Sequence, residues 1–269
     1  MMKKSISMLL GVIFALTPLT MSMASCKKST DTTTTTTAEN VETVPTTPKE
    51  LYEFATEKLA EADNYRVNYK QTVTLSGVKE FFVATAVDQT INESREGENV
   101  ICKLTQNGQK TELSHIDGMM YMVQDGTKAK AKMTWAKFVK HFEYERPDVM
   151  EQLPDSVYTN LTVTQSGEEQ ILKFKLNAKE MRSIAGDLRE FLQLGADSDN
   201  AEFQTGTYTV HINQEGRVCK TVLEMDLKMV YKYKECICYV TMESTIAYDS
   251  VKVKAPKDAD KYVDITGQL

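Results

Sequence analysis

The sequence lacks the short motifs by which hydrolases, metalloproteases and nucleotide-binding proteins are recognised. No HExxH, GxSxG, P-loop or GxGxxG pattern occurs, and the three histidines, His115, His141 and His211, stand apart without metal-ligand spacing. A Ser-His-Asp triad could still assemble in space, because triads are defined by geometry, but nothing in the chain favours one. We therefore expect a protein that is not an enzyme and that uses no catalytic residue, cofactor or metal.

A net positive charge and long apolar segments are also lacking. The formal net charge of −6 argues against nucleic-acid binding, which needs a basic surface, and against broad electrostatic attraction to anionic lipids. After the first 25 residues, no apolar stretch approaches the ~20 residues that a membrane-spanning helix needs. Any attachment to a membrane must therefore have another basis.

Cysteine is sparse, and its spacing fits neither a disulfide framework nor a common metal site. Cys236 and Cys238 are separated by one residue on a predicted strand, about 6.6 Å apart by strand rise, so a bond between them would strain the backbone. The paired CxxC motifs or histidine partners of a zinc site are absent. Buried, reduced cysteines are the favoured interpretation. A disulfide that involves Cys102, or a metal held by Cys102 and the Cys-x-Cys pair, are the alternatives.

What the sequence does contain begins with an export signal. Lys3 and Lys4 precede a short apolar run over residues 6–19, a pattern typical of a secretory signal. The segment Met23-Ala24-Ser25-Cys26 that follows resembles the bacterial lipobox. This resemblance implies that Cys26 carries a thioether-linked diacylglycerol and usually an acyl chain on its amine, which together give stable anchoring. An ordinary signal peptide with a chance cysteine is the alternative.

Composition divides the chain into three regions. Residues 1–25 form the predicted lipoprotein signal peptide. Residues 26–47 contain the lipidated cysteine and a tether in which positions 32–37 are all threonine; this stretch has too little apolar surface to fold. Residues 48–269 form the folded domain. We expect export, with lipid anchoring on the extracytoplasmic face of the cell membrane.

The folded domain is predicted to open with a helix and to continue as an antiparallel meander. Thr47-Pro48-Lys49-Glu50 places a capping hydroxyl, a first-turn proline and a capping-box glutamate in register. From Tyr65 the apolar period changes to two. Tight turns are predicted at Asn107-Gly108, Asp117-Gly118 and Asp125-Gly126. The strands expected here cover residues 65–75, 81–91, 100–106, 110–115, 119–124 and 127–133.

Two further helices and a long final hairpin are predicted after the meander. The first helix, over residues 135–144, carries an aromatic stripe, and the second is opened by Asn177 and continues to about residue 192. Strands are expected at 157–165 and 171–176. In the hairpin, apolar residues alternate with polar ones from Cys219 to Met229 and again from Cys236 to Tyr248.

This order of elements, over roughly residues 48–265, resembles the lipoprotein-carrier superfamily (LolA/LolB-like, LppX-like). The segments Ala255-Pro256-Lys257-Asp258-Ala259 and Asp117-Gly118-Met119-Met120-Tyr121 are similar to those of its Gram-positive lipoprotein members. The resemblance implies an α+β fold, in which a curved antiparallel sheet, an incomplete β-barrel, has helices packed on its concave face. It also implies a hydrophobic cavity between sheet and helices, and it supplies no catalytic motif.

Methionine and aromatic residues gather on the predicted apolar faces, where they can either fill a core or line an adaptable cavity. We expect a membrane-anchored lipoprotein that binds or carries a lipid or acyl chain, as a monomer. The alternative is a non-enzymatic surface lipoprotein that uses the same scaffold to bind another envelope protein. The predicted cavity residues are Trp135, Phe138, Phe142, Met181, Ile184, Leu188, Met225 and Met229.

Overall fold

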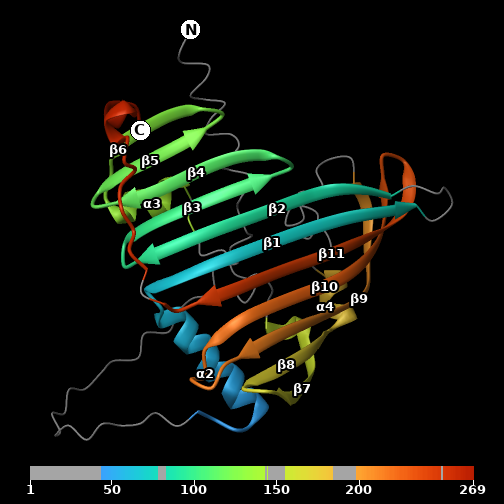
Figure 1. The fold of residues 1–269 in the computed structure, drawn as a ribbon. Helices are drawn as coiled ribbons and strands as arrows, with labels where there is room; N and C mark the ends of the chain where they lie inside the picture. The colour runs from blue at the N-terminus through green and yellow to red at the C-terminus, as the bar shows by residue number, and fades with distance from the viewer. Residues whose placement is uncertain (1–43, 78–82, 143, 145–154, 184–197, 250) are drawn as a thin grey trace, which may run out of the picture.

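One large, open and curved sheet dominates the structure (Figure 1). A computed structural model describes residues 44–77, 83–142, 144, 155–183, 198–249 and 251–269. The sheet has 12 strands in the order β12-β6-β5-β4-β3-β2-β1-β11-β10-β9-β8-β7. Every neighbouring pair is antiparallel except β12 and β6, which are parallel. The expected curved antiparallel sheet is thus confirmed.

The strand bounds agree with the sequence expectation for most of the chain. They are β1 (Asn64–Gly77), β2 (Val83–Glu96), β3 (Asn99–Gln106), β4 (Gln109–Ile116), β5 (Met119–Gln124), β6 (Thr127–Lys132), β7 (Tyr158–Ser166), β8 (Glu169–Leu176), β9 (Ser198–Ile212), β10 (Val218–Tyr231), β11 (Lys234–Ala247) and β12 (Val263–Asp264).

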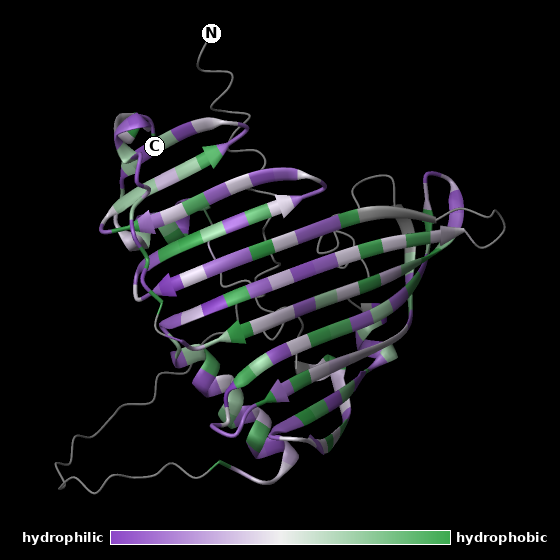
Figure 2. Ribbon diagram, in the orientation of Figure 1, coloured by the Kyte–Doolittle hydropathy of each residue, from purple (hydrophilic) through white to green (hydrophobic). Residues whose placement is uncertain are grey.

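The central strands alternate between a buried and a solvated side (Figure 2). In β1, Tyr65, Val67 and Leu75 are buried, whereas Arg66 and Lys70 between them are exposed. Such alternation is expected where one face of an antiparallel sheet packs on a core and the other meets water.

The sheet consists of two meanders joined at one seam. Strands β1 to β6 pair in sequence order, and so do β7 to β11. The seam is the pairing of β1 with β11, whose register runs from Arg66 opposite Ala247 to Gly77 opposite Cys236. The chain therefore brings its first and last long strands together at the centre of the sheet.

Three α-helices occur among the described residues. Helix α2 (Pro48–Glu61) begins where the proline predicts. The prediction of a capping box is wrong in one detail. The Thr47 hydroxyl donates to the Glu50 carboxylate and does not cap a backbone N–H. The other two helices are α3 (Trp135–Phe142) and α4 (Ala178–Ser183); the rest of the second predicted helix, with Ile184 and Leu188, lies outside the described residues.

The three predicted turns form as expected. Asn107, Asp117 and Asp125 have φ angles of 48°, 51° and 48°, and the glycine after each also has a positive φ. Two successive residues in the left-handed region match the right-handed twist of a hairpin. Asn-Gly and Asp-Gly pairs therefore set the register of β3 through β6.

The strands β3 to β6 are covered on both faces. Methionines 120 and 122 share one cluster with Phe138 and Phe142 of α3. On the opposite face, Tyr121 packs with Val251, Val253 and Tyr262 of the C-terminal segment. This segment then pairs as β12 with β6, so that the end of the chain binds the far edge of the sheet.

Two expectations for the second half need correction. Strand β9 has no counterpart among the predicted strands, because its alternation is interrupted around Gly206 and its register with β10 shifts twice. A further irregularity between Val218 and Lys220 places Val218, and not Cys219, on the buried face. A β-bulge reverses the side on which each following residue lies, so a strict period of two fails there.

The turn between β9 and β10 depends on glycine at position 216. Gly216 has a φ of +73°, and a Cβ built there would lie 2.3 Å from Cε1 of Phe54 on α2. We expect Gly216→Ala to lower the free energy of unfolding by about 2–4 kcal/mol, because it combines left-handed strain with a clash.

The matched control is Gly126→Ala, at a φ of +78° with nothing within 4 Å of the added Cβ. This variant should lose only the conformational part, about 1–2 kcal/mol. Urea unfolding followed by circular dichroism measures both. If both variants lose the same free energy of unfolding, the clash between the added Cβ and Phe54 has no energetic effect.

Candidate functional site

The predicted cavity residues fall into two separate buried clusters. Trp135, Phe138 and Phe142 belong to the cluster formed by α3 and strands β3 to β6. Met225 and Met229 of β10 belong to the main cluster, together with Met181 of α4. The structure thus brings the residues of each subset together, but the two subsets lie in different clusters. That either subset contacts a ligand stays a prediction.

The α3 subset packs ring against ring. The Phe138 ring is fully buried, and its centroid lies 5.1 Å from that of Phe142 and 5.6 Å from those of Trp135 and Tyr144. The imidazole of His115 completes the shell at 5.2 Å. Centroid separations of 4.5–7 Å are those of favourable aromatic contacts. Phe138 is therefore surrounded by side chains of the protein itself.

His115 is held beneath these rings by two carbonyl groups. Its Nδ1 lies 2.9 Å from the carbonyl oxygen of Glu98, and its Nε2 lies 3.0 Å from that of Met133. Only 2% of the residue is exposed. An imidazole that is shielded in this way, with a backbone oxygen facing each ring nitrogen, is a structural group, because neither nitrogen is available to a substrate.

A buried carboxylate lies next to this cluster. Glu93 of β2 is 2% exposed, and the Tyr65 hydroxyl donates a hydrogen bond of 2.9 Å to its Oε1. Glu93 stands between Val67 of β1 and Cys102 of β3 in the sheet register. Buried carboxylates are rare unless they are paired, so this site is one of the most constrained in the protein.

The surroundings of Glu93 shift the pKa values of its neighbours. Burial, followed by the charge of Glu93, raises the pKa of Tyr65 and holds the pKa of Tyr144 well above the usual range. Burial and Glu93 also raise the pKa of the Cys102 thiol. The Cζ atom of Arg95 lies 6.0 Å from the centroid of the Tyr65 ring and 5.2 Å from that of the Trp135 ring. These groups form a charge-balanced structural network, in which a raised thiol pKa opposes nucleophilic reactivity.

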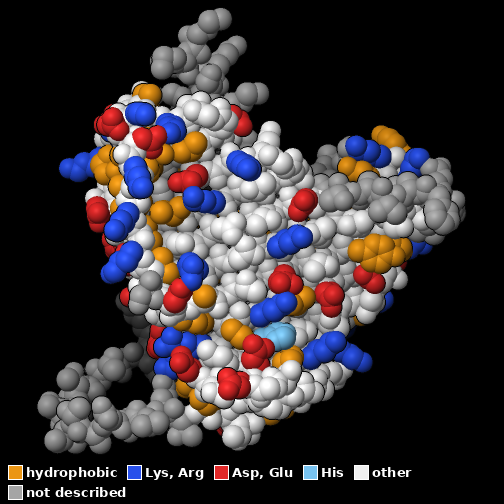
Figure 3. Space-filling model, viewed as in Figure 1, with side chains coloured by type: hydrophobic (Ala, Val, Ile, Leu, Met, Phe, Trp, Pro, Cys, Tyr) orange, Lys and Arg blue, Asp and Glu red, His pale blue; other side chains and the backbone are white. Residues whose placement is uncertain are grey.

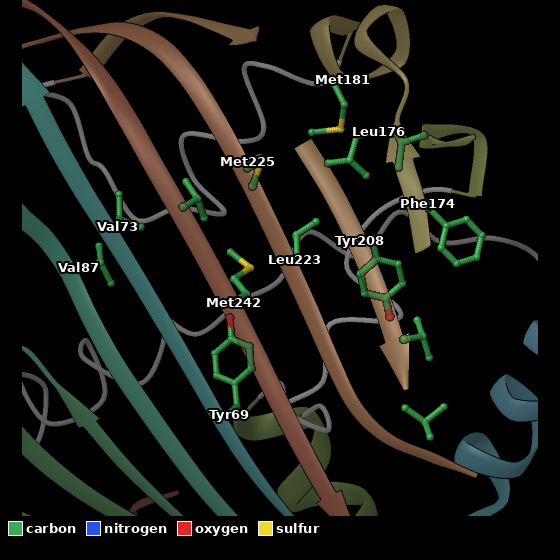
Figure 4. Close-up of a cluster of buried hydrophobic side chains, with 14 of the residues drawn as sticks. Tyr69, Val73, Val87, Phe174, Leu176, Met181, Tyr208, Leu223, Met225 and Met242 are labelled. Carbon is green, nitrogen blue, oxygen red and sulfur yellow. The ribbon is translucent and has the colours of Figure 1, made fainter. Parts of the chain in front are cut away.

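The main cluster has a different character, because flexible side chains cover a wide area of the sheet. Met225 and Met229 of β10 and Met242 of β11 are at most 2% exposed. Figure 4 shows Leu223 and Met225 on β10, Met242 on the neighbouring β11, and Met181 of α4 beside Leu176. Helix α2 adds Leu51, Ala55 and Leu59 to the same cluster. Thioether side chains adapt their shape to irregular apolar partners.

A row of uncharged polar residues crosses this apolar face. We call it the polar row, and it consists of Thr221 (β10), Ser244 (β11), Tyr69 and Gln71 (β1), and Gln89 (β2). Thr221 pairs with Ser244, Ser244 with Tyr69, and Gln71 with Gln89. All are at most 4% exposed, and the Tyr69 hydroxyl donates to Oε1 of Gln71 at 3.1 Å. In Figure 4 the Tyr69 hydroxyl points towards Met242, so the row borders the methionines.

Among the described residues, the cysteines and His211 form no disulfide and no metal cluster. Cys102, Cys219, Cys236 and Cys238 are free thiols. Cys219 donates to the backbone oxygen of His211, whose Nδ1 lies 2.9 Å from Oε2 of Glu169. Burial and the nearby Glu169 raise the pKa of Cys219 to about 11, which disfavours the thiolate. In the described part of the chain, no group of three His, Cys, Asp or Glu residues could hold a metal ion.

The outer face of the sheet is a solvated surface. Figure 3 shows lysines and arginines interspersed with acidic residues and no extended area of one charge. For example, Nζ of Lys103 lies 3.2 Å from Oε2 of Glu112. Likewise, Nζ of Lys220 lies 3.1 Å from Oε1 of Glu243. None of the helices in the described ranges is long and apolar enough to cross a membrane. The buried face is thus the stronger candidate for a ligand.

The sequence contains a signal for two of these buried polar positions, Gln71 and Glu93. Gln71 continues the period of two from Tyr69 to Val73, and Glu93 continues it from Ile91. A polar residue in an inward register is a buried polar residue, which is more informative than a buried methionine.

Comparison with known proteins shows no family. No family model matches the sequence, and neither does any curated protein. Among solved structures, a DUF1329 family protein from Desulfovibrio piger is 9% identical with a TM-score of 0.22, over 75% of this chain and 92% of that chain. An N-terminal dehydratase from the difficidin assembly line is 8% identical with a TM-score of 0.13, over 75% and 82% of the two chains. TM-scores this low carry no argument about function, and membership of the lipoprotein-carrier superfamily stays a prediction.

Proposed function

We propose that this protein is a non-enzymatic, monomeric lipoprotein that is anchored in the cell membrane through Cys26 and binds a lipid or acyl chain on the buried face of its sheet. The observation that carries the proposal is the broad, methionine-rich area on β10 and β11, which shares one cluster with residues of α2 and α4. In this proposal the helices lie on the concave face and the ligand lies between them and the sheet. Ligand sites are mostly apolar with a few placed polar groups, and this face has both.

We place the ligand beside Met225 and Met229 and not beside the α3 rings. Phe138 is enclosed by four aromatic side chains of the protein, whereas the methionines can rearrange around a guest. The test is extraction of lipid from the purified full chain, followed by mass spectrometry. The expected result is a non-covalent lipid in about stoichiometric amount, and a chain purified without any lipid that also fails to take up an added one would refute the proposal.

A second candidate, binding of another envelope protein, is favoured by one exposed residue. Tyr233 at the turn between β10 and β11 is fully exposed, and both Lys232 and Tyr233 adopt a positive φ, of 49° and 66°. Non-glycine residues in that region cost about 1–2 kcal/mol each, and exposed tyrosines are frequent at interfaces. If the extraction yields no lipid, chemical crosslinking from position 233 is the next experiment.

Anchoring is tested at the cysteine itself. Cys26→Ala should abolish incorporation of radioactive fatty acid and leave either unprocessed precursor or a released soluble form, because Cys26 is the lipobox cysteine that would form the thioether. The control, Cys219→Ala, should keep full labelling and membrane association. Labelling that persists in Cys26→Ala would show that the lipobox resemblance is a coincidence.

A further inference from the structure

Three members of the polar row have buried polar atoms without a partner among the described residues. Thr221 and Ser244 are fully buried, and Gln71 is 3% exposed. Among the described residues, no group hydrogen bonds to Oγ1 of Thr221, Oγ of Ser244 or Nε2 of Gln71. Buried polar atoms almost always have a partner, and those that do not usually indicate a bound molecule or a functional role. Three such atoms on neighbouring strands of one face are therefore a feature to be explained.

We propose that the polar row binds the uncharged, oxygen-bearing group of an amphipathic ligand, such as the ester and hydroxyl groups of an acylglycerol. This rests on the proposed function, and it adds which part of the sheet binds which chemical group. Hydroxyl and amide groups can donate to an ester carbonyl, and the two hydroxyls can also accept from an alcohol. The ligand thus supplies the partners that the fold does not.

The residues of the polar row favour an uncharged group of the ligand. The five residues include no Lys, Arg or His, so a carboxylate or phosphate bound there would be buried without an opposite charge, which is strongly unfavourable. The buried acid on this side of the sheet, Glu93, already accepts from Tyr65 and is balanced by Arg95, so this network has no surplus positive charge for an anion. Ionised fatty acids are therefore poorer ligands than their neutral esters.

The position of the row suits a molecule with a polar group and a long tail. Thr221, Ser244 and Tyr69 lie on three consecutive strands, which are about 4.8 Å apart, so they span about 10 Å across the sheet. From the row, β10 continues with Leu223, Met225, Leu227 and Met229 on the same buried face. The polar group lies on the row, and the tail follows β10 towards Met229.

The test compares two probes that differ only in the polar group. The full chain carrying Cys26→Ala, which removes its own acyl chains, is titrated with a pyrene-labelled monoacylglycerol and with a pyrene-labelled alkane of equal length. Thr221→Val and Ser244→Ala should each weaken monoacylglycerol binding about 3- to 10-fold, the range expected for one hydrogen bond. Alkane binding should be unchanged or slightly stronger.

Matched controls lie on β11, the strand of Ser244. Thr245→Ala and Thr241→Val remove hydroxyls from the exposed face of β11 and should change neither affinity. Thr221→Val and Ser244→Ala should also leave the urea midpoint unchanged or raised, because each removes an unpaired buried hydroxyl. This measurement verifies that the variants fold.

The outcomes separate the two proposals. If the parent binds both probes but Thr221→Val and Ser244→Ala bind monoacylglycerol as well as the parent does, the row is not the polar subsite, although the apolar site stands. If the parent binds neither probe, the proposed function fails and the polar row fails with it. A lower urea midpoint in both variants would also overturn the assignment, since it would mean that their hydroxyls are already paired within the protein.

Discussion

Replacing Phe138 by alanine should lower the free energy of unfolding by about 3–5 kcal/mol, the loss typical of a fully buried aromatic ring. Phe138 is 0% exposed and touches the rings of Trp135, Phe142, Tyr144 and His115. Its removal leaves a space that these rings cannot fill without moving. Urea unfolding followed by tryptophan fluorescence is a direct measurement, because the only tryptophan of the chain, Trp135, lies in the same cluster.

The same variant decides whether the α3 rings border a ligand. The control is Tyr239→Ala, which removes a 45% exposed ring from β11 and should change stability by no more than about 0.5–1 kcal/mol. A loss below about 1.5 kcal/mol at Phe138, together with changed affinity for an apolar probe, would move the ligand site from the β10 methionines to α3.

The second large effect is expected at Glu93. Glu93→Ala should cost about 3–5 kcal/mol, because it removes one partner of a buried network and leaves the others without compensation. The Tyr65 hydroxyl loses its acceptor, and Arg95 loses its electrostatic interaction with Glu93. Glu93→Gln keeps an oxygen for Tyr65 and should lose less. Thermal and urea unfolding of the three proteins give this ranking.

An exposed glutamate provides the matched control for this experiment. Oε1 of Glu243 lies 3.1 Å from Nζ of Lys220, and the Glu243 side chain is 42% exposed. Glu243→Ala should therefore cost at most about 1 kcal/mol, as is typical of surface ion pairs. If Glu93→Ala is no more destabilising than Glu243→Ala, burial of the Glu93 carboxylate has no structural importance.

Local sequence chemistry was sufficient for much of the first half of the fold. Pro48 marks the start of α2, and the bounds predicted for β5 agree with the structure, because short meander strands are set by their Asp-Gly turns. The long hairpin of β10 and β11 followed from its alternation alone. These features depend on residues close together in the chain, where propensity and turn geometry dominate.

Long-range and irregular features could not be predicted in this way. Strand β9 lacks a clean period because it is bulged against β10, and the assignment of Cys219 to the core failed for the same reason. The division of the cavity residues into two clusters depends on strand order, which no local pattern encodes. Within the site, Gln71 is polar, so the apolar period alone does not place it, although its register puts it inside.

The seam between β1 and β11 also determines the order in which the molecule can fold. Arg66 of β1 donates to Asp249, a residue 183 positions away in the chain. Each meander pairs only consecutive strands and can therefore form early. The seam must wait for closure of a very long loop, and such distant contacts slow folding. Until β11 arrives, β1 presents an unpaired edge, which can pair with another chain. In an unfinished molecule, the centre of the final sheet is thus the part most prone to aggregation.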